Sequence, residues 1–97
     1  MQIFDDSDAQ YIAWLQENPG AYVLTRRRAK SDNYLVLHKA TCGKIRNYTQ
    51  MARPGGFTER SYIKVGSSSL EALHKYARTK GGRPDSSFSG KCRICSP

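Results

Sequence analysis

Apolar residues recur at helical spacing near the start of the chain. Those that share one face of the predicted helix are Tyr11, Ile12, Trp14 and Leu15. The helix is expected to run from about residue 8 to 16, with Ser7 and Gln10 forming a capping box at its start. It should end before Pro19, because proline disfavours helical backbone in the residue that precedes it. We interpret Trp14 as an anchor in the core.

A second helix is predicted after a run of three serines, residues 67–69. Ser68 is the expected N-cap, with Glu71 as its capping-box partner. The buried stripe of this helix should consist of Leu70, Leu73 and Ala77. The pair Gly81-Gly82 is expected to end it, because glycine readily adopts the backbone that terminates helices.

Short runs of strand-forming residues predict three strands. They cover residues 21–25, 34–37 and 62–65. A polar loop, residues 26–33, joins the first two into an antiparallel hairpin, and a turn is predicted at residues 53–56. The expected fold class is α+β, in one domain of residues 1–97. It has an N-terminal helix, a three-stranded, mostly antiparallel sheet, a second helix and a C-terminal tail that ends in a Cys-x-x-Cys motif.

Four residues with metal-ligand chemistry occur in two spaced pairs. They are His38, Cys42, Cys92 and Cys95, and they include every cysteine in the chain. Zinc prefers four thiolate or imidazole ligands in a tetrahedron, and a Cys-x-x-Cys turn lets two sulfurs reach one ion. Such a set leaves no position open for water, so we expect one structural zinc ion. In a chain of 97 residues, of which 38% are hydrophobic, a metal would supply stability that a small core lacks.

Other interpretations of these residues leave more unexplained. A redox pair usually lies at a helix N-terminus, but no residues remain after Cys95 to form that helix. Cys42 alone would be an ordinary buried thiol and His38 an ordinary strand histidine, but the Cys-x-x-Cys motif would then have no partner. The remaining histidine, His74, is expected to be a surface or half-buried residue of the second helix and not a ligand.

The charge of the chain indicates a polyanionic partner. There are 16 Lys and Arg residues against 8 Asp and Glu, a net charge of +8 and a pI near 9.7. DNA, RNA and anionic membrane surfaces all attract such a protein. No segment approaches the roughly 20 apolar residues of a membrane span, and the acidic N-terminus lacks the apolar run of a signal peptide. We therefore expect a cytoplasmic protein that associates with nucleic acid and not with a membrane.

Three motifs follow one another along the chain: Leu37–Ile45, Ser69–Leu73 and Cys92–Pro97. Their order of ligand, three residues, cysteine, strand, helix and Cys-x-x-Cys-x-Pro resembles that of the metal-binding domain of the Ada DNA-repair protein and its small relatives. The likeness covers roughly residues 34–97, and it implies a zinc-centred α+β fold and DNA association. The first ligand in Ada is a cysteine that accepts a methyl group, whereas His38 stands here, and the stretch between the ligand pairs is longer. The resemblance therefore carries over the metal role of the four ligands but no catalysis.

Basic residues gather between positions 26 and 60, among amides and aromatic residues. The candidates for nucleic-acid contact are Arg26, Arg27, Arg28, Lys30, Lys44, Arg46, Arg53 and Arg60. Arginine and lysine bind phosphates, amides read base edges and aromatic rings stack on bases. We expect a non-enzymatic, zinc-stabilised domain that binds nucleic acid, DNA in particular, alone or beside a nuclease or repair enzyme.

Two other functions fit the sequence. One is a protein-interaction or inhibitor module that binds an acidic partner. The other is a zinc-thiolate alkyl acceptor with Cys42, Cys92 or Cys95 as nucleophile, because zinc-bound thiolates can react in electropositive surroundings.

Overall fold

The computed structural model of the chain describes residues 1–28, 34–46, 55–80, 85, 87–93, 95 and 97, apart from the side chain of Lys44. Its elements are β1 (Gln2–Phe4), α1 (Asp8–Glu17), β2 (Tyr22–Arg27), β3 (Leu35–Lys39), the 3₁₀ turn η1 (Gly43–Ile45), β4 (Tyr62–Ser67), α2 (Leu70–Thr79) and β5 (Gly90–Lys91). The α+β class is confirmed. The predicted turn at 53–56 falls partly, and the helix end at 81–82 wholly, outside the described residues.

The sheet has five strands in the described chain, where the sequence predicted three. Their order is β1-β4-β2-β3-β5; β5 pairs with β3 in parallel, and the other pairs are antiparallel. The prediction missed β1 because it buries only Phe4, and β5 because it is two residues long. A second error concerns Arg26 and Arg27, which were placed in a loop. Both continue β2, because β4 pairs with that strand as far as Arg27.

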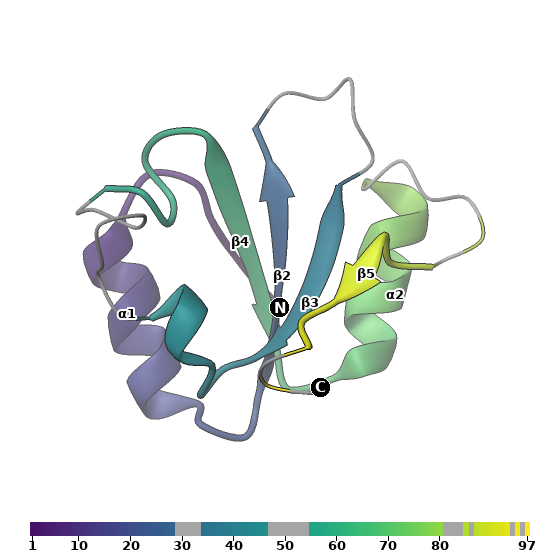
Figure 1. The fold of residues 1–97 in the computed structure, drawn as a ribbon, viewed down its shortest axis with the longest axis horizontal. Helices are drawn as coiled ribbons and strands as arrows, with labels where there is room; N and C mark the ends of the chain where they lie inside the picture. Colours follow the sequence, from purple (N-terminus) through teal and green to yellow (C-terminus); the bar gives the residue numbers. More distant parts are fainter. Residues whose placement is uncertain (29–33, 47–54, 81–84, 86, 94, 96) are drawn as a thin grey trace.

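The two helices cover opposite faces of the sheet, as Figure 1 shows. Val23 on β2 packs into the cluster that contains α1 residues Tyr11 and Leu15. The next residue, Leu24, packs into the cluster that contains Leu73 of α2. Because successive strand residues point to opposite faces, this switch between clusters makes the fold a three-layer arrangement.

The first helix follows the prediction closely. It spans Asp8–Glu17, and the Ser7 hydroxyl accepts a hydrogen bond from the Gln10 amide at 3.1 Å, as an N-cap does. Trp14 is half-buried and packs against the α1-side core. A Cβ added at Gly66 on β4 would lie 2.5 Å from its ring. Glycine at this position therefore lets the indole lie directly on the sheet.

The second helix differs from the prediction in two details. Its N-cap is Ser69 and not Ser68, because β4 continues to Ser67 and the helix starts at Leu70; the Ser69 hydroxyl accepts from the Ala72 amide at 3.2 Å. Leu70 is exposed at this first turn, while Tyr76 completes the buried stripe with Leu73 and Ala77.

Candidate metal centre and basic surface

The fold brings the four predicted metal ligands together. One ligand atom from each of His38, Cys42, Cys92 and Cys95 lies within 4.8 Å of the others. His38, Cys42 and Cys92 are buried and Cys95 is half-buried, and the three cysteines form no disulfide. The arrangement is that of a closed Cys₃His site, which can hold one metal ion.

The spacing of the sulfur atoms fits a common ion. The Sγ atoms of Cys42 and Cys92 are 3.9 Å apart. Two thiolates bound at about 2.3 Å to one tetrahedral zinc ion lie about 3.8 Å apart. The backbone N–H of Lys39 donates to Cys95 Sγ at 3.3 Å. Thiolates are the form of cysteine that binds metals.

Backbone pairing places the two halves of the site beside each other. His38 lies near the end of β3, and a short turn carries the chain to Cys42, whose amide donates to the Lys39 carbonyl at 3.0 Å. The C-terminal segment lies along β3: the Cys92 amide donates to the Leu37 carbonyl at 2.8 Å. The sequence spacing predicted the ligands, and the parallel pairing of β5 with β3 explains how they meet.

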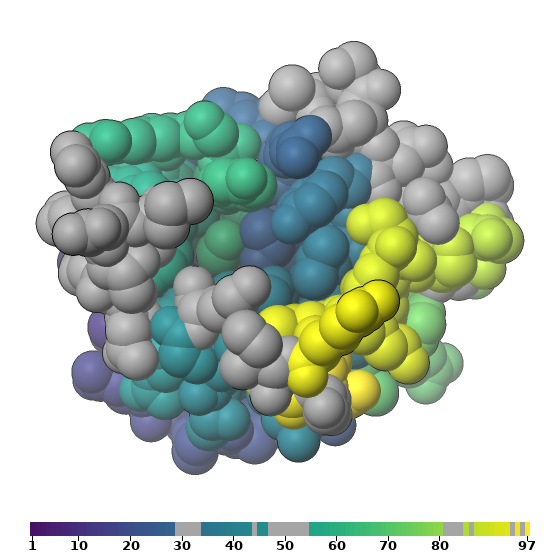
Figure 2. Space-filling view, in the orientation of Figure 1, coloured from purple at the N-terminus to yellow at the C-terminus, as the bar shows by residue number. Residues whose placement is uncertain are grey.

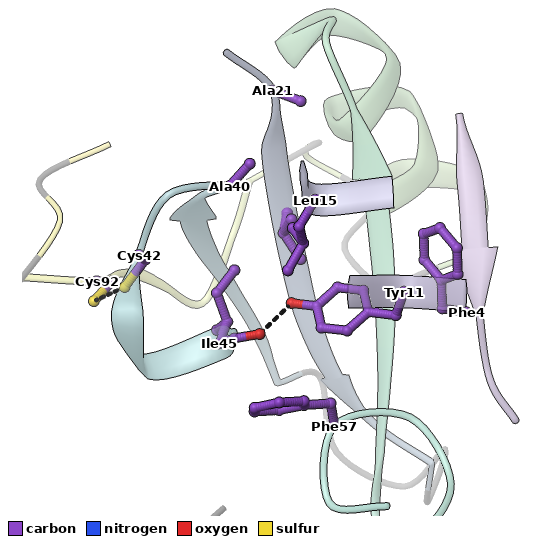
Figure 3. Close-up of a cluster of buried hydrophobic side chains, with 10 residues drawn as sticks. Phe4, Tyr11, Leu15, Ala21, Ala40, Cys42, Ile45, Phe57 and Cys92 are labelled. Carbon is purple, nitrogen blue, oxygen red and sulfur yellow. Dashed lines mark hydrogen bonds between the residues drawn. The ribbon is translucent and has the colours of Figure 1, made fainter. Parts of the chain in front are cut away.

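A buried tyrosine of α1 supports the ligand turn. The Tyr11 hydroxyl donates to the Ile45 carbonyl in η1 at 2.7 Å, next to Cys42 and Cys92 in the same core cluster (Figure 3). Burial, with smaller contributions from Cys42 and Asp8, raises the pKa of Tyr11 well above its usual value. The hydroxyl therefore stays protonated and remains a donor.

Three of the predicted basic residues, Arg27, Arg28 and Arg60, lie away from the metal ligands. Val23 pairs with His38, and Arg27 is four residues further along β2, about 13 Å at the usual strand rise. Arg28 and Arg60 lie at the Arg27 end, where Arg28 Nε donates to the Arg60 carbonyl at 2.8 Å. The metal centre and this group of arginines thus occupy opposite ends of β2.

Two of these arginines make contacts that stabilise the fold. Arg26 donates to the Tyr76 hydroxyl of α2 at 2.7 Å. Arg28 donates to the carbonyls of Asp5, Thr58 and Arg60 at 2.6–2.8 Å and so joins three segments. Substitution of either residue would disturb the structure as well as remove a charge.

The structure gives the exposure of some of the remaining predicted basic residues and does not describe the others. Arg27 and Arg60 are exposed, and Arg46, which directly follows η1, is half-exposed. Lys30 and Arg53 lie outside the described residues, as does the side chain of Lys44. His74 is exposed, as expected, and its ring stacks on Phe88 with centroids 4.3 Å apart.

Two charged residues, Asp8 and Lys64, are buried although the sequence did not predict it. The carboxylate of Asp8 accepts hydrogen bonds from the Gly55, Phe57 and Thr58 amides and from the Thr58 hydroxyl, at 2.7–3.3 Å. Burial alone would raise the pKa of Asp8, but these bonds outweigh it and lower the pKa. Lys64 is buried in the middle of β4, and desolvation lowers its pKa to about 8 despite the opposing charge of Asp8.

Comparison with known proteins supplies no relative from which to take a function. No protein-family model matches the chain, and neither a curated protein nor a solved structure matches it. The likeness to the Ada metal-binding domain therefore stays a prediction from motif order. Within the described chain, neither helix has the length and apolarity needed to cross a bilayer.

Proposed function

We propose that this protein is a non-enzymatic, zinc-stabilised domain that binds nucleic acid, DNA in particular. The observation that carries the proposal is the separation of two features along β2. A closed Cys₃His cluster lies at one end and a group of exposed arginines at the other. In this proposal the metal end stabilises the fold, and the positive charge of the arginine end attracts an anionic ligand.

Zinc is the ion best suited to the cluster. Three thiolates and one imidazole are soft or borderline ligands, and the Cys42–Cys92 sulfur separation of 3.9 Å suits tetrahedral coordination. Four protein ligands leave no position for water, so the ion has a structural role in the proposal. It would fasten the end of β3 to the C-terminal segment, which otherwise pairs with the sheet through a two-residue strand.

The arginine end is suited to a phosphate backbone. The guanidinium of Arg27 lies over the Tyr34 ring, 4.7 Å from its centroid, and the residue is exposed. A cation–π contact holds an arginine in place without removing its charge. Arg60 lies nearby and is also exposed. With a net charge of +8, this end can attract DNA by releasing its counterions.

Fluorescence anisotropy with a short labelled DNA duplex, at several salt concentrations, tests the proposal. The zinc-loaded protein should bind at low salt, and affinity should fall steeply as salt rises. Arg27→Ala with Arg60→Ala should weaken binding and lower the slope of log affinity against log salt by about one per lost phosphate contact. Lys75→Glu on α2, across the sheet, also lowers the net charge by two and is the matched control.

Two results would contradict the proposal. The first is no duplex binding by the folded, zinc-loaded protein at low salt. The second is equal weakening by Lys75→Glu and the arginine pair, because attraction would then depend on net charge and not on this surface. Arg26 and Arg28 are avoided as test positions because their side chains bond to the fold.

A further inference from the structure

The middle of the sheet contains two buried polar side chains that neither the metal centre nor the apolar core requires. Thr25 on β2 and Lys64 on β4 are directly opposite each other and are only 6% and 4% exposed. Residues paired in this way project from the same face, with Cβ atoms about 5 Å apart. In the part of the chain that the structure describes, the Thr25 hydroxyl oxygen has no hydrogen-bond partner. Buried hydroxyls are normally bonded, so this one points to a missing partner.

The surroundings of Lys64 are unfavourable for a structural lysine. Its Nζ lies 5.2 Å from the centroid of the Tyr62 ring and 6.0 Å from that of Phe57. The acidic group that acts on it is Asp8, whose oxygens already accept four hydrogen bonds from the 55–58 segment. A buried ammonium held mainly by aromatic rings lowers stability. Its position is better explained by a ligand than by packing.

An aromatic and cationic rim lies directly beside this pair. Arg27 is opposite Tyr62, one step along the same face from Thr25 and Lys64. Tyr34 immediately precedes β3, and its ring centroid is 6.3 Å from that of Tyr62. Both tyrosines are half-exposed. A ligand on this face would meet ring surfaces at the rim and polar atoms at the floor.

Figure 2 shows a depression over β2 and β3, between the green segment that leads into β4 and the yellow C-terminal segment. Thr25, Lys64, Arg27, Tyr34 and Tyr62 lie together on one face of the sheet, and we name the surface that they form the sheet recess. Its position on the α1-side face follows from the pairing of Thr25 and Lys64, two residues from Val23 and Gly66.

We propose that the sheet recess binds one unpaired base of a nucleic acid. The inference rests on the proposed function and adds the kind of structure that is bound. Aromatic residues on a sheet stack on unstacked bases, and polar groups beneath them bond to base edges. The tyrosine rings at the rim favour a base, whose ring can stack on them, over a phosphate, which has no ring.

The chemistry of the floor also sets a preference among bases. Lysine has only donors, whereas a threonine hydroxyl can donate or accept. Guanine offers the O6 and N7 acceptors, and adenine presents an amino donor where guanine has O6. The recess should therefore prefer an unpaired guanine to an unpaired adenine.

Three labelled DNA duplexes of equal length test the proposal by anisotropy at one salt concentration: fully paired, with one bulged guanine and with one bulged adenine. The zinc-loaded protein should bind the guanine bulge about tenfold more tightly than the paired duplex, and the adenine bulge less tightly than the guanine bulge. Thr25→Val and Lys64→Met should abolish the preference for the guanine bulge and leave binding of paired duplex within about twofold. Lys75→Met should preserve the preference. Circular dichroism confirms that each variant is folded.

The outcomes separate the two proposals. Salt-dependent binding of paired duplex with no gain from a bulged guanine would overturn the sheet recess as a base site and leave the proposed function standing. A bulge preference that survives in both Thr25→Val and Lys64→Met would overturn it equally. No binding of any duplex at low salt would overturn both proposals.

Discussion

The hydroxyl of Tyr11 donates a 2.7 Å hydrogen bond to the carbonyl of Ile45 in the interior of the protein. Tyr11 belongs to α1, and Ile45 ends the turn that begins just after the ligand Cys42. The bond joins two segments separated by 34 positions. The N-terminal helix therefore supports the conformation of the turn that carries the candidate ligand Cys42.

Tyr11→Phe should destabilise the protein by about 1–2 kcal/mol, because it leaves the buried Ile45 carbonyl without its donor. Chelator should also remove the metal faster from this variant, since the ligand turn loses a support. Urea unfolding and the rate of metal release measure the two effects. Tyr22→Phe, at a half-buried tyrosine on β2, is the matched control; an equal effect of the two substitutions would contradict the role of the Tyr11 bond.

Asp8→Asn should destabilise the protein by roughly 2–4 kcal/mol at pH 7, because charged acceptors make the stronger hydrogen bonds. The folded-state pKa of Asp8 lies below its ordinary value of 3.8. The stabilisation by its carboxylate is therefore complete above that value and is lost as pH falls through the folded-state pKa. The difference in unfolding free energy between wild type and Asp8→Asn, measured from pH 7 to pH 3, should shrink at the acid end.

The control for this prediction is Asp6→Asn, at an exposed carboxylate two residues earlier. It should change stability by less than about 0.5 kcal/mol, as surface substitutions usually do. A difference between wild type and Asp8→Asn that stays constant down to pH 3 would show that the carboxylate charge is not what stabilises the 55–58 segment.

Lys64→Met should stabilise the protein at pH 7. Desolvation lowers the folded-state pKa of Lys64 from 10.5 to about 8, a change worth roughly 3 kcal/mol at 1.36 kcal/mol per pKa unit. The unfolded chain binds more protons between these values, so the cost is full below pH 8 and disappears as pH rises to 10.5. In urea unfolding between pH 6 and 10.5, the unfolding free energy of wild type should rise relative to that of Lys64→Met as pH increases. The unfolding free energy of Lys75→Met should depend on pH as that of wild type does. If the curve for Lys64→Met runs parallel to the wild-type curve, the predicted cost of burying Lys64 is contradicted.

The cluster of candidate metal ligands could be predicted because ligand chemistry depends on residue type and short spacing. His38 and Cys42 are close in sequence, as are Cys92 and Cys95. Such a set of residues suits zinc better than most other ions. The helices were also predictable, since Ser7 and the apolar period mark α1 directly. Local motifs of this kind can be recognised without knowledge of the tertiary fold.

The features that could not be predicted depend on contacts between residues that are far apart in the sequence. From the sequence, Asp8 is an ordinary acidic residue in the first turn of a helix. Only the tertiary fold brings the backbone amides of the 55–58 segment to its carboxylate. Lys64 alternates with apolar neighbours as an exposed strand residue would, but the fold buries it on the α1 side of the sheet. β5 contributes two residues and depends on pairing with β3, which no local pattern in the C-terminal segment indicates.

Native mass spectrometry of the purified chain, before and after a strong chelator, tests the central claim that one zinc ion holds this domain together. The untreated protein should carry one zinc ion per chain in a compact charge-state distribution. Chelator should remove the ion and shift the chain to the highly charged states of an unfolded protein, because structural zinc binding is coupled to folding. A compact protein that carries no metal, or that keeps its compact charge states after losing it, would contradict the claim.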